Sequence, residues 1–168
     1  GETGEIYIES KLLMDEYLNQ PEKTEDVLTE NGYRTGDIGH LADSYLFISG
    51  RAKEMIIVAG NKVFPIEVEQ VLSRHPLVKE VAVTGQDHQR LGQIVKATIV
   101  VADAALGETL DGEDEAGAKA AREEILKSLK EFSKENLKRE LRPMVWNLRA
   151  LSNPLPKTRS GKVDKKLL

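Results

Sequence analysis

Residues 50–76 read GRAKEMIIVAGNKVFPIEVEQVLSRHP. The secondary structure predicted for this stretch indicates the fold of the rest of the chain. The apolar run at residues 55–58 predicts a short strand, which ends at Gly60. Pro65 suits the first turn of a helix, because the N–H that proline lacks would have no helical partner there. Pro76 cannot continue that helix. The stretch therefore predicts a strand followed by a short helix.

The chain before this stretch predicts several more strands. Residues 5–8 alternate between polar and apolar side chains, as a half-buried strand does. Residues 33–41 and 45–48 predict two strands joined by a turn around residues 42–44. Between them and the first strand, residues 21–24 predict a short helical turn.

The chain after Pro76 continues with strands and then becomes acidic. Residues 78–83 and 94–101 are rich in β-branched side chains and predict two strands. Residues 103–117 are acidic and contain glycine, so they predict a mobile, solvated loop.

The last third of the chain predicts one long helix and a terminal loop. Apolar residues recur at helical spacing up to Leu141, where Pro143 ends the pattern; they are Ile125, Leu129, Phe132 and Leu137. Residues 144–151 predict a strand, and the basic, Pro/Gly/Ser-rich residues 153–162 predict a loop. The mixed order of strands and helices, without an internal repeat, favours an α+β fold over a doubly wound sheet.

The composition excludes several classes of function. Among 168 residues, 31% are charged and 40% hydrophobic, as in globular proteins. A net charge of −4 argues against general binding to nucleic acid, which needs a basic surface. No run approaches the roughly 20 apolar residues of a membrane span. With no secretion-type segment in the sequence and no cysteine, we expect a cytoplasmic protein without disulfides.

The sequence does not predict a metal site. Its three histidines, His40, His75 and His88, lie far apart and on different predicted elements. Surface or hydrogen-bonded histidines are the simpler interpretation.

Two loops place a charge beside a glycine. In YRTGD at residues 33–37, the carboxylate of Asp37 is suited to accept hydrogen bonds from a sugar diol, and a turn-capping aspartate is the alternative. Next to Gly50, Arg51 offers a planar fork for phosphate or ribose oxygens. A surface salt bridge with Glu54 is the alternative for this arginine.

A third loop, residues 157–162, forms a basic tip with the sequence KTRSGK. A lysine such as Lys162 on a tip of this kind is suited to stabilise an anion during a reaction. A solvated basic tail is the alternative.

Taken together, these loops and their neighbours resemble the adenylate-forming superfamily, which includes acyl-CoA synthetases, luciferases and nonribosomal peptide adenylation domains. The resemblance covers almost the whole chain except the acidic segment and the long helix. The matching stretches are GETGEI at 1–6, YLN and PEKT within 17–24, YRTGD at 33–37, GRAKEMI at 50–56 with Gly60, VFPIEVE at 63–69, HPLV and EVAV within 75–83, and LPKTRSGKV at 155–163.

The resemblance implies the fold and its division. Residues 1–50 would be the terminal strands of the large AMP-binding domain. Residues 51–168 would be the small carboxyl-terminal domain, a short antiparallel sheet flanked by helices. The start at Gly1 without methionine suggests a segment excised from a longer chain.

The resemblance also implies a reaction in two halves. A carboxylate attacks the α-phosphate of ATP to give an acyl-adenylate, and a thiol, usually that of coenzyme A, then takes the acyl group and releases AMP. Asp37 would bind the ribose hydroxyls, Arg51 would contact ribose or phosphate, and Lys162 would enter the site during adenylation. Mg²⁺ would be held by the large domain, the missing partner of this chain.

Other positions take their roles from the same resemblance. Lys53 matches the hinge about which the small domain turns between half-reactions. Gly60 would line the pantetheine tunnel, and Lys62 would meet the nucleotide of coenzyme A. The sequence departs from many relatives at Ile57, where they carry lysine, and in the basic pair Lys165-Lys166, which is displaced behind Asp164.

The leading interpretation is the carboxyl-terminal part of an acyl-CoA synthetase for a fatty or other apolar acid, inactive without the phosphate loop and acyl pocket of the large domain. One alternative is an adenylation domain that loads a carrier-protein thiol, although Phe64-Pro65 and residues 155–158 favour the coenzyme A branch. The other alternative is a stand-alone, non-catalytic interaction module.

Overall fold

The computed structural model describes residues 2–112 and 114–168, so Gly1 and Glu113, which fall in the predicted first motif and acidic loop, lie outside the described residues. The chain divides into two units, Gly1–Lys53 and Glu54–Leu168. The boundary falls beside the predicted hinge residue Lys53. No helix in the described part of the chain has the length and apolar character needed to cross a bilayer.

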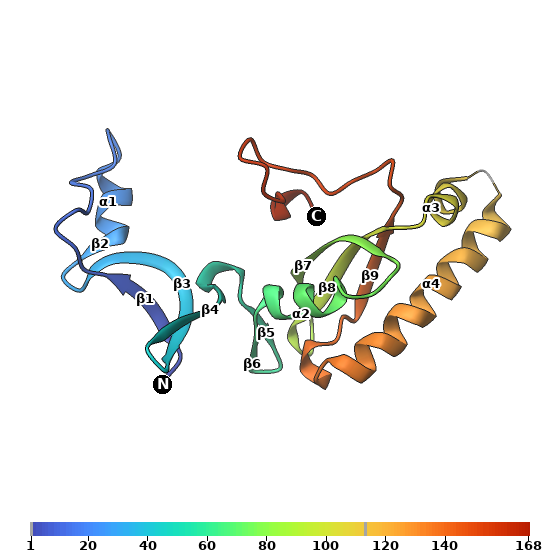
Figure 1. Ribbon diagram of the computed structural model, residues 1–168, viewed down its shortest axis with the longest axis horizontal. Coiled ribbons are helices and arrows are strands. Elements are labelled where there is room, and N and C mark those ends of the chain that lie inside the picture. Colours follow the sequence, from blue (N-terminus) through green and yellow to red (C-terminus); the bar gives the residue numbers. More distant parts are fainter. Residues whose placement is uncertain (1, 113) are drawn as a thin grey trace. The chain divides into compact units, whose positions relative to one another are not determined.

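The first unit is a sheet built around one long strand, β3. Strands β1, β2 and β4 each pair antiparallel with β3 (Figure 1). Gly32 begins β3 at a φ of +102°, and a Cβ there would lie 2.5 Å from the carbonyl oxygen of Ile8, so both the conformation and the space require glycine. The elements are β1 Gly4–Ile8, α1 Pro21–Val27, β2 Leu28–Thr29, β3 Gly32–Ala42 and β4 Tyr45–Arg51.

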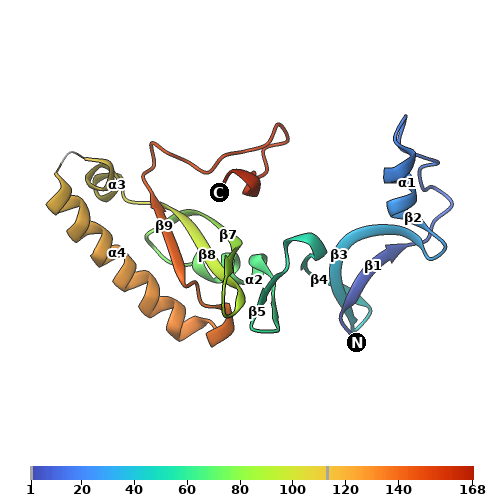
Figure 2. The ribbon, with the colours of Figure 1, turned by 180° about the vertical axis from the view of Figure 1, so that it is seen from behind.

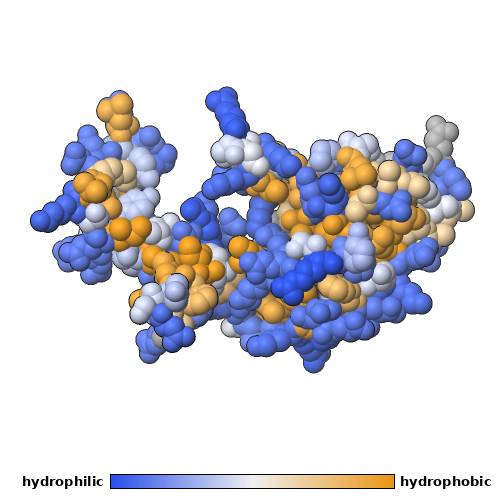
Figure 3. Space-filling view, viewed as in Figure 1, coloured by the Kyte–Doolittle hydropathy of each residue, from blue (hydrophilic) through white to orange (hydrophobic). Residues whose placement is uncertain are grey.

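The hairpin of β3 and β4 exposes apolar side chains. Tyr45 is 71% exposed and Ile48 is 59% exposed, and Figure 3 shows hydrophobic residues in orange on the surface of the first unit. The other exposed apolar residues of the hairpin are Leu41, Leu46 and Phe47. Exposed apolar side chains gathered on one hairpin are typical of a region that packs against another protein surface.

The second unit is a five-stranded sheet with helices packed on it. Its strand order is β6-β5-β8-β7, and β9 pairs with β8, so β8 lies between β7 and β9 (Figure 2). The elements are β5 Ile56–Val58, β6 Asn61–Val63, α2 Pro65–Leu72, β7 Val78–His88, β8 Gly92–Val101, α3 Ala104–Asp111, α4 Glu115–Asn136 and β9 Val145–Arg149. Three 3₁₀ turns complete the chain: η1 Ala52–Glu54, η2 Arg139–Leu141 and η3 Lys165–Leu167.

The main hydrophobic core of the second unit lies between its sheet and the helices α2 and α4. The apolar face of α4 contributes Ile125 and Leu129, and α2 contributes Val68 and Leu72, all of them fully buried. They pack against a sheet face whose members include Val83, Val95, Ala97 and Ile99. The apolar residues of α4 recur at intervals of four, as an amphipathic helix requires.

The fold class is confirmed as α+β, with two small sheets and helices on the second. The sheet of the second unit is antiparallel with one exception, because β9 runs parallel to β8 from Lys96↔Val145 to Val100↔Arg149. The strand predicted at residues 144–151 is therefore correct. The long helix ends at Asn136, earlier than Leu141, which instead closes the short turn η2. Strand β6 was not predicted.

The predicted loop at residues 103–117 is wrong, because this segment contains helix α3 and the start of α4. The carboxylate of Asp103 accepts a hydrogen bond from the N–H of Leu106 at 3.0 Å and caps α3. Asp114 caps α4 in the same way through the N–H of Ala116 at 3.1 Å. Leu110 is buried in the core. The acidic residues that suggested a solvated loop thus include two helix caps.

Candidate functional site

The structure brings Asp37 and Arg51 together on neighbouring strands of the first unit. The two residues are directly paired in the β3–β4 register, and Arg51 Nε lies 3.0 Å from Asp37 Oδ1. Arg51 therefore pairs with Asp37 and not with Glu54, the alternative raised by the sequence. Both side chains remain partly exposed, at 48% for Arg51 and 26% for Asp37. The pair presents a carboxylate and a guanidinium side by side to solvent.

The backbone before Asp37 is shaped by a local turn. Thr35 Oγ1 accepts a hydrogen bond from the N–H of Asp37 at 3.0 Å and donates one to the carbonyl of Ile6 at 2.9 Å. Gly36 has a φ of +73°, which explains the glycine between the two residues. The hydrogen bonds of Thr35 and the conformation of Gly36 thus fix the position of Asp37 on β3.

Two tyrosines lie near this pair. The hydrogen bond between the side chains of Tyr33 and Tyr17 raises the pKa of Tyr33, while the positive charge of Arg51 opposes that shift. The backbone N–H of Tyr17 also donates a hydrogen bond to Thr24 Oγ1 at 3.0 Å. The segment before α1 is therefore tied to the helix that follows it.

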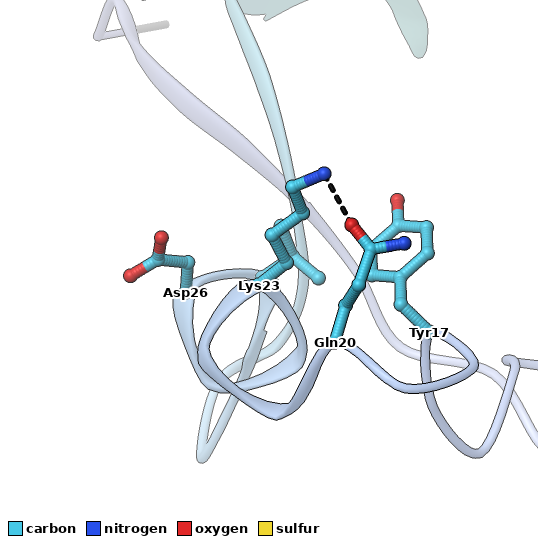
Figure 4. Close-up of a pocket in the computed structure, with 5 residues that line it drawn as sticks. Tyr17, Gln20, Lys23 and Asp26 are labelled. Carbon is cyan, nitrogen blue, oxygen red and sulfur yellow. Dashed lines mark hydrogen bonds between the residues drawn. The ribbon is translucent and has the colours of Figure 1, made fainter.

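A shallow hollow of about 350 Å³ lies beside Tyr17 (Figure 4). In it, Lys23 Nζ donates a hydrogen bond to Gln20 Oε1, and Asp26 points away from that contact. The sequence did not indicate this hollow. Its walls are partly polar and partly apolar, and we assign it no ligand.

Lys162 lies on an exposed loop of the second unit, and the backbone of this loop is closed on itself. The N–H of Thr158 donates to the carbonyl of Lys162 at 2.7 Å, and the N–H of Gly161 donates to that of Thr158 at 2.9 Å. Gly161 has a φ of +81°, which glycine adopts at little cost. Among the described residues, no ion pair involves Lys162. The loop therefore presents the Lys162 ammonium group to solvent on an ordered backbone.

The base of this loop is anchored to the sheet. Glu80 on β7 accepts hydrogen bonds from the N–H of Leu155 at 3.3 Å and from Lys157 Nζ at 3.0 Å. The hydrogen bond from Lys157 holds the pKa of Glu80 below its usual range. Leu155 is buried with Ala82 and Val100 in a second small core. The loop also forms one wall of an open groove of about 540 Å³ beside α2.

A second anchor lies just beyond the loop. Lys165 Nζ lies 3.0 Å from Glu54 Oε2 and 2.8 Å from Glu69 Oε1. Sequence reasoning identified neither Glu80 nor this trio, because their members are up to 111 residues apart in the chain. The displaced basic pair Lys165-Lys166 was the one signal present in the sequence.

The other predicted site residues lie at turns. Lys53 is an exposed residue of η1 at the boundary between the units. Gly60 and Ala59 have φ values of +85° and +47°, typical of a two-residue type I′ turn between β5 and β6. Gly60 is thus explained locally by its backbone. Lys62 is exposed on β6.

The described residues contain no group of three or more metal-ligating side chains. His40 stacks on Phe47 with ring centroids 5.3 Å apart, and His75 Nε2 lies 3.1 Å from Ser128 Oγ. Burial lowers the pKa of His75. The Asp37 carboxylate and the Arg51 fork have the chemistry to contact a nucleotide.

Comparison with known proteins agrees with these features. The AMP-binding enzyme C-terminal domain family matches residues 67–162. The long-chain-fatty-acid–CoA ligase FadD13 of Mycobacterium tuberculosis is 48% identical over 101 residues, which are 60% of this chain and 20% of that protein. The putative acyl–CoA ligase YdaB of Bacillus subtilis is 34% identical over 169 residues, covering 100% of this chain and 29% of that protein.

A solved structure gives the same result. The o-succinylbenzoate CoA synthetase MenE of Bacillus subtilis, in complex with its acyl-adenylate intermediate, has a TM-score of 0.76 and 27% identity over 96% of this chain and 29% of that one. The chain thus spans about a fifth to three tenths of the length of these relatives. It belongs to the AMP-binding enzyme C-terminal domain family, and with it to the adenylate-forming superfamily.

Proposed function

We propose that this chain is the carboxyl-terminal catalytic part of an ATP-dependent acyl-CoA synthetase. In the first half-reaction, a substrate carboxylate oxygen bonds to the α-phosphorus of ATP, the bond to pyrophosphate breaks and pyrophosphate leaves. In the second, a thiol sulfur bonds to the acyl carbon, AMP leaves and the thiol proton is released. The substrate would be a fatty or other apolar acid.

The observation that carries this proposal is the loop of Lys162. Its ammonium group is exposed on a backbone that is closed by two short hydrogen bonds and anchored through Glu80. A cation held in this way is suited to a position where negative charge develops, because it needs little reorganisation when the reaction takes place. Lys162 would contact the substrate carboxylate and the bridging oxygens during adenylation.

The pair on the first unit would bind the nucleotide. The Asp37 carboxylate would accept hydrogen bonds from the ribose hydroxyls, and the fork of Arg51 would contact ribose or phosphate oxygens. The contact between Arg51 and Asp37 at 3.0 Å orients both groups before the nucleotide arrives. Mg²⁺, when bound by the remainder of the protein, would neutralise phosphate charge.

Lys53 would be the hinge between the two half-reactions. It lies in a three-residue turn at the boundary between the two compact units, and a hinge needs only a few residues that absorb a backbone change. After the turn, the β5–β6 hairpin with Gly60 would line the path of the thiol, and Lys62 would meet the nucleotide of coenzyme A.

The partner of this chain would be the remainder of the protein, the large domain. The exposed apolar surface of the β3–β4 hairpin supports this proposal, since residues such as Tyr45 and Ile48 would be covered by further strands. These relatives are about three times as long as this chain, which leaves room for such a domain.

The first test uses this chain alone. Mixed with ATP, Mg²⁺, coenzyme A and a panel of fatty and aromatic acids, the purified chain is expected to release no pyrophosphate above the buffer blank, because the phosphate loop and the acyl pocket would lie in the large domain. A coupled pyrophosphate assay measures this. The longer protein recovered from the upstream coding sequence serves as the positive control, and turnover by the short chain would contradict the proposed division of labour.

Assays of the same longer protein distinguish coenzyme A from a carrier protein as the acceptor of the acyl group. Given acid and ATP, it is expected to transfer the acyl group to coenzyme A, and mass spectrometry of the products identifies the thioester. Transfer only to a phosphopantetheinylated carrier protein would instead support the adenylation-domain alternative. Absence of any acyl-adenylate would support the non-catalytic module.

Removal of the Asp37 carboxylate is expected to weaken nucleotide binding in the longer protein. Hydrogen bonds to a charged group contribute about 1.5–3 kcal/mol, so Asp37→Ala should raise the dissociation constant for AMP about 10- to 100-fold. Isothermal titration with AMP measures the change. The exposed Glu30→Ala serves as the control on the same unit and should bind AMP normally; unchanged binding by Asp37→Ala would contradict the assignment.

A further inference from the structure

Lys165 forms the most enclosed ion-pair cluster among the described residues. Its ammonium group lies between two carboxylates, 3.0 Å from Glu54 and 2.8 Å from Glu69. The side chains of Lys165 and Glu69 are only 25% and 21% exposed. Glu69 is itself fixed, because its Oε1 also accepts a hydrogen bond from the N–H of Val83 at 2.8 Å.

Each charged group of this cluster has a partner of opposite charge. Burial lowers the pKa of Lys165, but the hydrogen bonds and charges of Glu69 and Glu54 outweigh burial and leave the pKa raised. A partly buried cation with two partners differs from an ordinary surface salt bridge, because removal of one partner leaves the others desolvated and unpaired. The contacts therefore hold η3 against α2 and η1.

The position of Lys165 in the chain links this cluster to the Lys162 loop. Lys157 and Val163 form an antiparallel bridge at the base of the loop, and the N–H of Asp164 donates to the carbonyl of Pro156 at 2.8 Å. The loop leaves the sheet at the Glu80 anchor and returns at the Lys165 anchor. Both ends of the loop are thus held by a carboxylate–ammonium contact.

We propose that Lys165 is a positioning residue for Lys162, and that through Glu54 it fixes the catalytic loop to the residue that follows the hinge. The proposal rests on the proposed function, and the family comparison assigns no such role. Glu54 directly follows Lys53, so a turn at the hinge would carry Glu54, η3 and the loop together. Without the cluster, the loop would lose its ion-pair anchor on the Lys165 side, and Lys162 would be in place for a smaller fraction of the time.

The first experiment measures loop order in this chain without any reaction. Lys165→Met is expected to speed amide hydrogen exchange at Thr158, Gly161 and Asp164 about tenfold, because the backbone hydrogen bonds of the loop open more often. Lys166→Met is the matched control, since this neighbouring lysine is exposed and should leave exchange within about twofold. Mass spectrometry of peptides covering residues 156–164 measures both.

A second variant guards against misfolding. Glu54→Gln removes the more exposed of the two carboxylates, and the thermal unfolding midpoint of each variant shows that the second unit is intact. If Glu54→Gln and Lys165→Met both fold and both leave exchange of the loop unchanged, the positioning role is wrong. If Lys165→Met does not fold, Glu54→Gln decides the question alone.

The second experiment measures catalysis in the longer protein. Lys165→Met is expected to lower kcat for acyl-adenylate formation about tenfold while the KM for ATP stays within about twofold, because the nucleotide contacts proposed at Asp37 and Arg51 are untouched. Lys165→Arg should restore most of kcat, since a guanidinium fork reaches two carboxylates. An equally large change in the KM for ATP, or a loss of kcat that Lys165→Arg does not restore, would indicate general structural damage and overturn the proposal.

A third variant separates this inference from the proposed function. If Lys162→Ala leaves adenylation unchanged, the proposed function itself fails. If Lys162→Ala abolishes adenylation but Lys165→Met does not reduce it, only the positioning role of Lys165 fails.

Discussion

Replacement of Lys162 by alanine in the longer protein is expected to slow acyl-adenylate formation by about 10²–10³-fold, the usual cost of removing one preorganised group that stabilises transition-state charge. The effect should be large because the loop holds the ammonium group on a closed backbone, with Thr158 N–H to Lys162 carbonyl at 2.7 Å. Alanine keeps that backbone contact and removes the side chain beyond Cβ, including the ammonium group. The loss should therefore fall on kcat rather than on folding.

Pyrophosphate release in single-turnover experiments measures this step directly. Arg159→Ala is the matched control, because this exposed cation lies on the same loop tip and its removal lowers the net positive charge equally. If both variants lose activity to the same extent, the loop acts through its general charge. If neither does, the assignment of Lys162 is wrong.

Truncation of Leu129 to alanine is expected to destabilise the second unit by about 2–5 kcal/mol, a large part of the 5–15 kcal/mol that typically holds a domain folded. Leu129 is fully buried on the face of α4 that packs against the sheet. The cavity left by its side chain cannot be filled without moving both α4 and the strands beneath it. The loss should shift the urea unfolding midpoint without changing the slope.

Trp146, the single tryptophan of the chain, reports this unfolding by fluorescence, because it packs against the same core. Glu131→Ala on the exposed face of α4 is the control and should change stability by less than about 0.5 kcal/mol. A midpoint for Leu129→Ala equal to that of the control would show that α4 does not contribute to the core as described.

Most of the secondary structure could be predicted from the sequence, because strands and helices depend on short-range periodicity. Strands β7 and β8 follow runs of β-branched residues, and α2 begins at Pro65 as expected. The prediction failed at residues 103–117, where composition indicated a loop and the structure has α3 and the start of α4. Asp103 and Asp114 act there as helix caps, a role that depends on geometry at two amide groups and not on acidity.

The motifs that define the family could also be identified from the sequence, but the sequence did not show which of their residues contact one another. Asp37 and Arg51 were each identified as candidates, yet their pairing follows from the register of the β3–β4 hairpin. Glu54 illustrates the limit most clearly, because a local pairing with Arg51 seemed natural and the structure gives it Lys165 instead.

The sequence by itself determined the α+β order of elements, the exposed loop that carries Lys162 and the likeness to adenylate-forming enzymes, because all three depend on residues close together in the chain. Only the tertiary structure decided how that loop is held. Glu80 and Lys157 are 77 positions apart, and Lys165 and Glu54 are 111 apart. Which carboxylate meets which ammonium group depends on strand register and helix packing, and these are set by burial of the whole core rather than by any local pattern.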